Sequence, residues 1–213
     1  MVFTMPPPRH GTKDLRALAR ARGVDLDEAL SRLRRLYADI DERNQRHTAD
    51  LDLPCKRGCS SCCEQSVFLT RLEFYGAWDY LQGQVSDAAL SAIVDEGLAL
   101  YERHKDIIDA FERPPPEGAR DHTGLARELR FRCPLLSEEG ACRVYPMREA
   151  LGRLFGCSFN DDSGIYGCDL VGKHLAGRTL TLVRARPMAS RVHLLPLAER
   201  QQVYPYWIHE LYG

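Results

Sequence analysis

The residues of this 213-residue chain that could do chemistry are its cysteines, because four of the eight fall within one nine-residue stretch. Thiolates are soft ligands that select zinc, copper(I) or iron–sulfur centres. Four thiols packed this closely are not typical of core filling, so the stretch predicts a metal or cluster site. The cysteines are Cys55, Cys59, Cys62 and Cys63, followed by Cys133, Cys142, Cys157 and Cys168.

The spacing of the first cysteines bears on the kind of centre. Cys55, Cys59 and Cys62 form a Cys-x3-Cys-x2-Cys pattern, which suits a cubane in which each cysteine binds a different iron. The adjacent Cys62 and Cys63 are expected to point apart, because neighbouring side chains tend to diverge. The eight cysteines then form either two four-thiolate centres or one centre with four spectators. For the last two cysteines, ordinary buried thiols are an equally good interpretation.

Composition restricts the class of protein. Lys and Arg number 29 and Asp and Glu 30, so the net charge is close to zero, which argues against a dedicated nucleic-acid-binding protein. No apolar run approaches the roughly 18 residues needed to cross a bilayer, and the N-terminus lacks the pattern of a secretory signal. We therefore expect a cytoplasmic protein with no membrane partner. In that reducing compartment clustered cysteines bind metal or do redox chemistry, whereas export would restore a disulfide interpretation.

Hydrophobic periodicity predicts the helices that must position these cysteines. Apolar residues recur every three or four positions over 26–49 and 86–112, and a capping box at Thr70 predicts a further helix over 70–81. Asp25 and Thr70 are typical helix N-caps, each with a glutamate three residues later. We therefore expect a mainly α fold with a small β component.

The domain organisation is expected to be simple. A flexible N-terminal lead-in over 1–24 precedes a single compact cysteine-cluster domain over 25–213, in which long helices surround a cysteine-ligated metal centre. Shorter elements are expected as extended segments at 67–69, 129–131 and 179–183, a loop over 114–127, a hairpin over 133–144, a helix from Pro146 to Phe155, and a terminal helix over 197–212 broken near Pro205.

The cysteines and the residues around them resemble a known family. It is the cysteine-cluster family described as a zinc- or iron-chelating domain, whose hallmark is CxxxCxxCC and whose cluster is related to that of flagellin lysine N-methylase. The resemblance covers about residues 50 to 160. Its matching motifs are the hallmark at 55–63, V-x-L-T-x-x-E at 67–73, C-P-x-L at 133–136, and G-x-C-x-x-Y-x-x-R at 140–148.

The chain departs from the family pattern at two positions. Glu149 stands where the family has proline, and Gly152 stands where the family has its next cysteine, although Arg153 is kept. One usual thiol is therefore missing. Either Cys157 or Cys168 replaces it, or the site is built from the six earlier cysteines.

Three functional hypotheses follow from the motifs and the resemblance. The first is a metal-binding protein with a thiolate-ligated centre drawn from all eight cysteines, an iron–sulfur cluster of 4Fe-4S type being favoured over zinc. The second is an enzyme of methyltransferase or redox type that uses the centre, and the third is a purely structural zinc site. Polar groups expected beside the centre are Tyr145, Arg148, Arg153 and Glu73, and no catalytic residue is assigned.

Overall fold

The structure is a computed structural model that describes residues 9–55, 58–112, 126, 128–161 and 163–213. Within these residues the fold is mainly helical with two small two-stranded sheets, which confirms the predicted mainly α fold with a small β component. The first eight residues of the predicted lead-in, and nearly all of the loop predicted over 114–127, lie outside the described part of the chain. No helix in the described part is long and apolar enough to span a bilayer.

The longest N-terminal helix, α2 (Leu26–Thr48), forms as the periodicity predicts. The Asp25 carboxylate accepts a hydrogen bond from the Glu28 N–H at 3.1 Å, so the predicted cap is present. The apolar stripe of α2 is buried against the main core. The short preceding helix α1 (Leu15–Arg20) packs on α2 through the buried Leu15.

The helix α3 (Arg71–Gln82) passes through the centre of the main core. Thr70 forms the predicted capping box, in which its N–H donates to the Glu73 carboxylate at 2.8 Å while the Glu73 N–H donates to its hydroxyl at 3.3 Å. The ring of Phe74 stacks with those of Trp78 and Trp207. Because α3 is buried nearly all round, it fixes the position of Glu73 deep in the molecule.

Two further helices complete this end of the molecule. The long α4 (Asp87–Ala110) is capped by Ser86 and packs closely on the C-terminal α9 (Tyr204–Tyr212). A Cβ added at Gly97 would lie 2.5 Å from Ile208 Cδ1, so glycine permits the close approach of the two helices.

The C-terminal segment differs from its prediction. Residues 201–203 form β4 (Gln201–Val203), which pairs antiparallel with β1 (Phe68–Thr70), and α9 begins only after them. Pro205 lies in the first turn of α9 and does not interrupt it. Proline fits there because that position has no intrahelical partner for an N–H. The prediction of one helix broken near Pro205 was therefore wrong.

Three shorter predictions also need correction. The segment 129–131 is irregular, and only Val183 of the strand predicted over 179–183 belongs to a strand, namely β3 (Val183–Arg184). The helix predicted from Pro146 is split into a 3-10 turn, η2 (Tyr145–Met147), and α6 (Ala150–Leu154). Two residues of extended backbone, Arg148 and Glu149, separate them.

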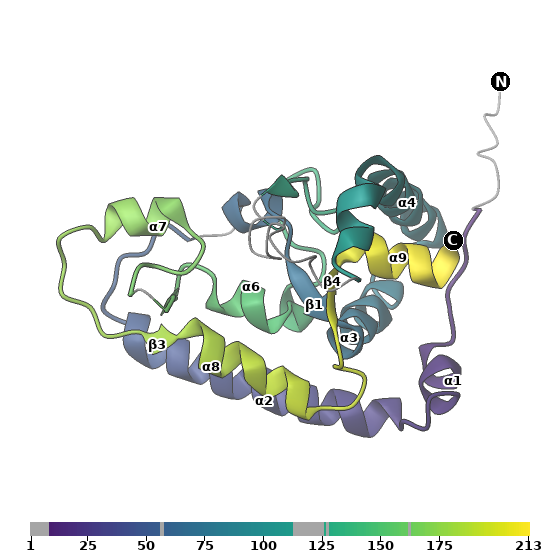
Figure 1. Ribbon diagram of the computed structural model, residues 1–213, viewed down its shortest axis with the longest axis horizontal. Helices are drawn as coiled ribbons and strands as arrows, with labels where there is room; N and C mark the ends of the chain where they lie inside the picture. Colours follow the sequence, from purple (N-terminus) through teal and green to yellow (C-terminus); the bar gives the residue numbers. More distant parts are fainter. Residues whose placement is uncertain (1–8, 56–57, 113–125, 127, 162) are drawn as a thin grey trace.

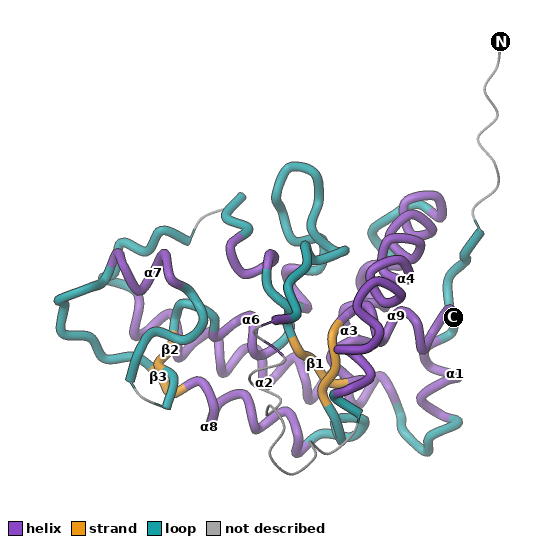
Figure 2. The backbone as a smooth tube through the Cα atoms, turned by 45° about the horizontal axis from the view of Figure 1, so that its top comes forward, coloured by secondary structure: helices purple, strands orange, loops and turns teal. Residues whose placement is uncertain are grey.

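The opposite end of the molecule has a small apolar cluster of its own. It is built on α7 (Asp169–His174), where Val171 and Leu175 are buried against Leu51 and Phe155. Beside it, β3 pairs in parallel with β2 (Ser158–Phe159). Figures 1 and 2 both show α7 far from α4 and α9, with loop segments between the two ends. Most of the cysteines lie in irregular or turn segments, and Cys62 and Cys63 lie in a short 3-10 turn.

Candidate metal centre

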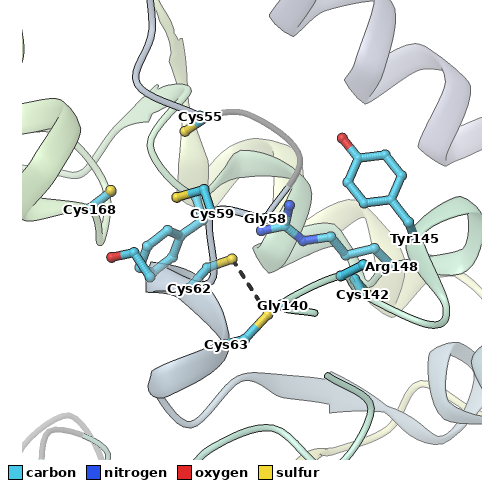
Figure 3. Close-up of a pocket in the computed structure, with 13 residues that line it drawn as sticks. Cys55, Gly58, Cys59, Cys62, Cys63, Gly140, Cys142, Tyr145, Arg148 and Cys168 are labelled. Carbon is cyan, nitrogen blue, oxygen red and sulfur yellow. Dashed lines mark hydrogen bonds between the residues drawn. The ribbon is translucent and has the colours of Figure 1, made fainter. Parts of the chain in front are cut away.

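Most of the cysteines line one cavity of about 550 Å³. Figure 3 shows five of their sulfur atoms, with the Arg148 side chain reaching in from the other side; they belong to Cys55, Cys59, Cys62, Cys63 and Cys168. Among the described residues, no histidine lines the cavity. The lining thiols are those of Cys55, Cys59, Cys62, Cys63, Cys142 and Cys168.

A short turn sets the geometry of the adjacent pair. The 3-10 turn η1 (Ser61–Glu64) carries Cys62 and Cys63, and their sulfur atoms lie 3.9 Å apart. The expectation that these neighbours point apart was therefore wrong, because the tight turn brings both thiols to one side. The hydrogen bond between the Cys62 and Cys63 sulfur atoms and the positive charge of Arg148 lower the pKa of the Cys62 thiol.

The predicted hairpin at Cys133–Cys142 is present and lies against the cysteine loop. The Cys133 N–H donates to the Cys63 carbonyl at 2.7 Å, and an isolated antiparallel bridge joins Leu136 to Cys142. Gly140, with φ at +77°, forms the turn, and a Cβ added there would lie 3.3 Å from the Gly58 carbonyl oxygen. These contacts bring together two stretches that are about seventy residues apart in the sequence.

Cys157 and Cys168 lie on the other side of the loop. Gly156 turns the chain with φ at +77°, and a Cβ added there would lie 3.3 Å from Cys168 Cβ. Burial raises the pKa of the Cys55 thiol to about 11, with further contributions from the charges of Cys157 and Cys168. Cys168 lines the cavity together with Cys55 and is buried in the small cluster around α7, whereas Cys157 is not among the lining residues.

Four polar residues were expected beside the centre, and the structure places them differently. Arg148 lines the cavity, and in the described part of the chain no carboxylate forms an ion pair with it. Tyr145 also lines the cavity and is 66% exposed. Arg153 pairs instead with Asp41, lies over the Tyr37 ring at 4.2 Å, and donates to backbone carbonyls of the η2–α6 segment.

The fourth expected polar residue, Glu73, is buried together with Glu149, and this burial was not anticipated from the sequence. Glu149 is 5% exposed, and its Oε2 accepts a hydrogen bond from the Tyr204 hydroxyl at 3.2 Å. Glu73 is also buried and accepts from the Tyr37 hydroxyl at 3.2 Å and from the Ala150 N–H at 2.8 Å. Burial, and to a smaller extent the charge of Glu149, raise the pKa of Glu73. The pair lies close enough to the thiols for the Glu149 charge to act on them.

The two departures from the family pattern are linked in space. A Cβ added at Gly152 would lie 2.2 Å from Glu149 Oε1 and 2.6 Å from Arg148 Nε. The Glu149 carboxylate therefore occupies the space that a side chain at position 152 would need. One indication of this packing was present in the sequence, because two positions three residues apart both differ from the family pattern.

Six thiols line the cavity, but their sulfur atoms do not converge on one position. Among the described residues, no three His, Cys, Asp or Glu donors are placed so that they could hold one metal ion. Ligation would thus require the sulfur atoms to move toward one another.

Comparison with known proteins identified no relative of this chain. No family model, curated protein or solved structure matches the chain. The resemblance to the cysteine-cluster family therefore rests on its motif residues alone and stays a prediction.

Proposed function

We propose that this chain is a metal-binding protein that carries a thiolate-ligated centre. The observation that carries the proposal is the cavity, because six cysteines from widely separated parts of the sequence line it. Unrelated buried thiols would have no reason to meet in one place. A ligand set of sulfur atoms alone selects soft metals, chiefly zinc or the iron of iron–sulfur clusters.

An iron–sulfur cluster is favoured over zinc. A cavity of about 550 Å³ has room for a polynuclear cluster, which a single ion would not need. The spacing of Cys55, Cys59 and Cys62 suits irons at different corners of a cubane. The Arg148 guanidinium supplies positive charge at the position where a thiolate-ligated cluster would carry negative charge.

Binding of metal to these thiols should release protons. Burial raises the pKa of Cys133 and Cys142, so both thiols are protonated at neutral pH in the metal-free protein. Metals bind the thiolate, so each ligand gained releases a proton. A bound cluster would supply electron transfer or a site for substrate coordination.

A second candidate function is an enzyme of methyltransferase or redox type that uses the centre. The observation in its favour is that Tyr145 and Arg148 line the same cavity as the thiols. A substrate with an anionic group would find a positive charge beside the centre. A purely structural zinc site has less support, because α2, α3, α4 and α9 share an apolar core of their own.

The proposal is tested by metal analysis of protein purified without oxygen. We expect iron and acid-labile sulfide in stoichiometric amounts, a brown colour with a broad visible absorption band, and an EPR signal in one redox state. The double variant Cys62→Ser/Cys63→Ser should lose bound metal. The control is His47→Ala, which removes an exposed side chain and should keep the metal content of the wild type.

Colourless protein that holds stoichiometric zinc would rule out the iron version of the proposal. Protein that holds no transition metal, even after anaerobic reconstitution with iron and sulfide or with zinc, would overturn the proposal itself.

A further inference from the structure

We propose that Arg153 is a positioning residue that fixes the backbone between η2 and α6 and thereby holds the Arg148 guanidinium in the thiol-lined cavity. Arg153 itself is not among the residues that line this cavity. The inference rests on the proposed function, because a cation held beside the thiols matters to a negatively charged centre. Arg153 would thus act on the centre through Arg148.

The first argument is that Arg153 is anchored to α2. Its guanidinium lies over the Tyr37 ring at 4.2 Å and forms an ion pair with Asp41. The Asn44 side-chain amide donates to the Arg153 carbonyl at 2.9 Å. Tyr37, Asp41 and Asn44 are four and three residues apart, so they lie on one face of the helix. The Arg153 side chain is only 9% exposed and therefore has a defined position against α2.

The second argument is that the same guanidinium holds the segment that carries Arg148. Its Nε donates to the Arg148 carbonyl at 2.7 Å, and its Nη2 donates to the Pro146 carbonyl at 2.7 Å. The backbone of Arg148 is extended, with φ at −57° and ψ at 135°, so it leaves the helical pattern of hydrogen bonds. A guanidinium presents its N–H donors in a fixed fork, so one arginine can bind both carbonyls and Asp41. A lysine ammonium lacks this fork.

The third argument is that a second buried side chain holds the other end of the segment. Glu73 Oε1 accepts a hydrogen bond from the N–H of Ala150, the first residue of α6, at 2.8 Å. Glu73 Oε2 accepts from the Thr70 N–H at 2.8 Å, so this carboxylate is tied to the N-terminus of α3. Between the two anchors, the Arg148 side chain extends into the cavity (Figure 3).

The charge placed in this way has a defined effect on a cluster. Burial by itself would lower the pKa of Arg148, but the charges of Cys62 and Glu149 outweigh it and raise the pKa, so the guanidinium stays positive. A cluster gains one negative charge on reduction, and a fixed cation nearby stabilises that state. Arg148 should therefore raise the midpoint potential of the centre as long as its position is held.

The first test is the midpoint potential of the cluster, measured by a redox titration followed by EPR. Arg148→Ala should lower the potential, because the positive charge is lost. Arg153→Lys should also lower it, since lysine keeps the charge but cannot hold both carbonyls. In the double variant, Arg153→Lys should add nothing to the effect of Arg148→Ala. The control is Arg43→Ala, which removes an exposed arginine paired with Asp39 on α2 and should leave the potential unchanged.

Three results of this titration would overturn the inference. The first is an unchanged potential in Arg148→Ala, since no charge would then act on the centre. The second is a wild-type potential in Arg153→Lys. The third is the same shift from Arg153→Lys with and without the Arg148 side chain, because Arg153 would then act independently of it.

The second test separates this inference from the proposed function, because it uses metal-free protein, whose long helices share an apolar core. The measurement is the heteronuclear NOE of arginine Nε–H groups by NMR. The Arg148 group should be rigid in the wild type and mobile in Arg153→Lys. The Arg71 group, paired with Glu210, should be rigid in both. An Arg148 group that is equally rigid, or equally mobile, in both proteins would overturn the inference.

Protein that binds no cluster but shows this loss of order would contradict the proposed function and leave the positioning role intact. A milder variant covers the case in which Arg153→Lys does not fold. Asp41→Asn weakens the same anchor at a carboxylate that is 53% exposed, and it should increase the mobility of Arg148 to a smaller degree. Unchanged order of Arg148 in that variant would overturn the inference.

Discussion

At the scale of single residues, Glu149 and Gly152, which both differ from the family pattern, fit against each other in space. Gly152 leaves space that the Glu149 carboxylate fills, and the Tyr204 hydroxyl donates to that carboxylate. Buried carboxylates are costly unless they are hydrogen-bonded, so this side chain cannot move freely. The same residue is adjacent to Arg148, whose guanidinium lines the cavity. A substitution at position 152 should therefore affect the position of Arg148 in the cavity.

Gly152→Ala should destabilise the protein by about 1–3 kcal/mol, the usual cost of inserting a methyl group into a filled space. The new Cβ would meet Glu149 Oε1 at 2.2 Å and Arg148 Nε at 2.6 Å. The measurement is urea unfolding of anaerobically purified protein.

The matched control is Gly172→Ala in α7. A Cβ there would meet only the Ile165 Cβ, at 4.0 Å, so we expect a small gain of about 0.5–1 kcal/mol, typical of replacing a helical glycine. If Gly152→Ala were as stable as this control, the packing argument for Glu149 would fail. Removing the carboxylate by Glu149→Ala should reduce the cost of Gly152→Ala.

At the scale of elements, the long helices and the site depend on different interactions. The helices α2, α3, α4 and α9 are held by the main core. The hairpin around Cys133 and Cys142 has one isolated bridge and a few backbone hydrogen bonds. The helix α7 has a core of only three buried residues. Metal should thus stabilise the hairpin and α7 far more than the long helices.

Removal of metal by a chelator should increase amide hydrogen exchange at 133–142 and 168–176, with little change in α2 and α4. The reason is that segments with few buried apolar contacts open locally unless a ligand holds them. Mass spectrometry of peptides from metal-bound and chelated protein measures the difference. Equal loss of protection along the whole chain would contradict this expectation and favour a structural metal needed for folding.

The elements also show what the sequence could predict. Helices near 26–49, 70–81 and 86–112 were recognisable because periodicity and caps are local signals. Pro205 was misinterpreted because proline both breaks helices and begins them, and only the pairing of β4 with β1 decides between the two. The break at Arg148 and Glu149 was missed because contacts distant in sequence impose it.

For the candidate site, the sequence indicated candidate residues but not their arrangement. Cysteine spacing indicated which residues could bind metal, and the hairpin was expected from its turn residues. The grouping of the thiols was not predictable, because it depends on contacts such as the Cys133 N–H with the Cys63 carbonyl. The burial of Glu149 was also hidden, since glutamate is usually exposed and only packing places it inside.

At the scale of the whole molecule, the cysteines lie where two bodies of unequal size meet. The larger contains the main core and the smaller is the cluster around α7 (Figure 1). Thiols from both bodies line one cavity. Metal bound there would join the two bodies, and the cavity beside it would give access to a substrate or an electron partner.

The most direct test of this account is X-ray absorption at the K-edge of the bound metal. The account predicts a first shell of sulfur atoms alone at about 2.3 Å, the length of a metal–thiolate bond. An iron–sulfur cluster would add iron neighbours in the second shell. A first shell containing nitrogen or oxygen, as histidine or carboxylate ligands would give, would contradict a thiolate-ligated centre.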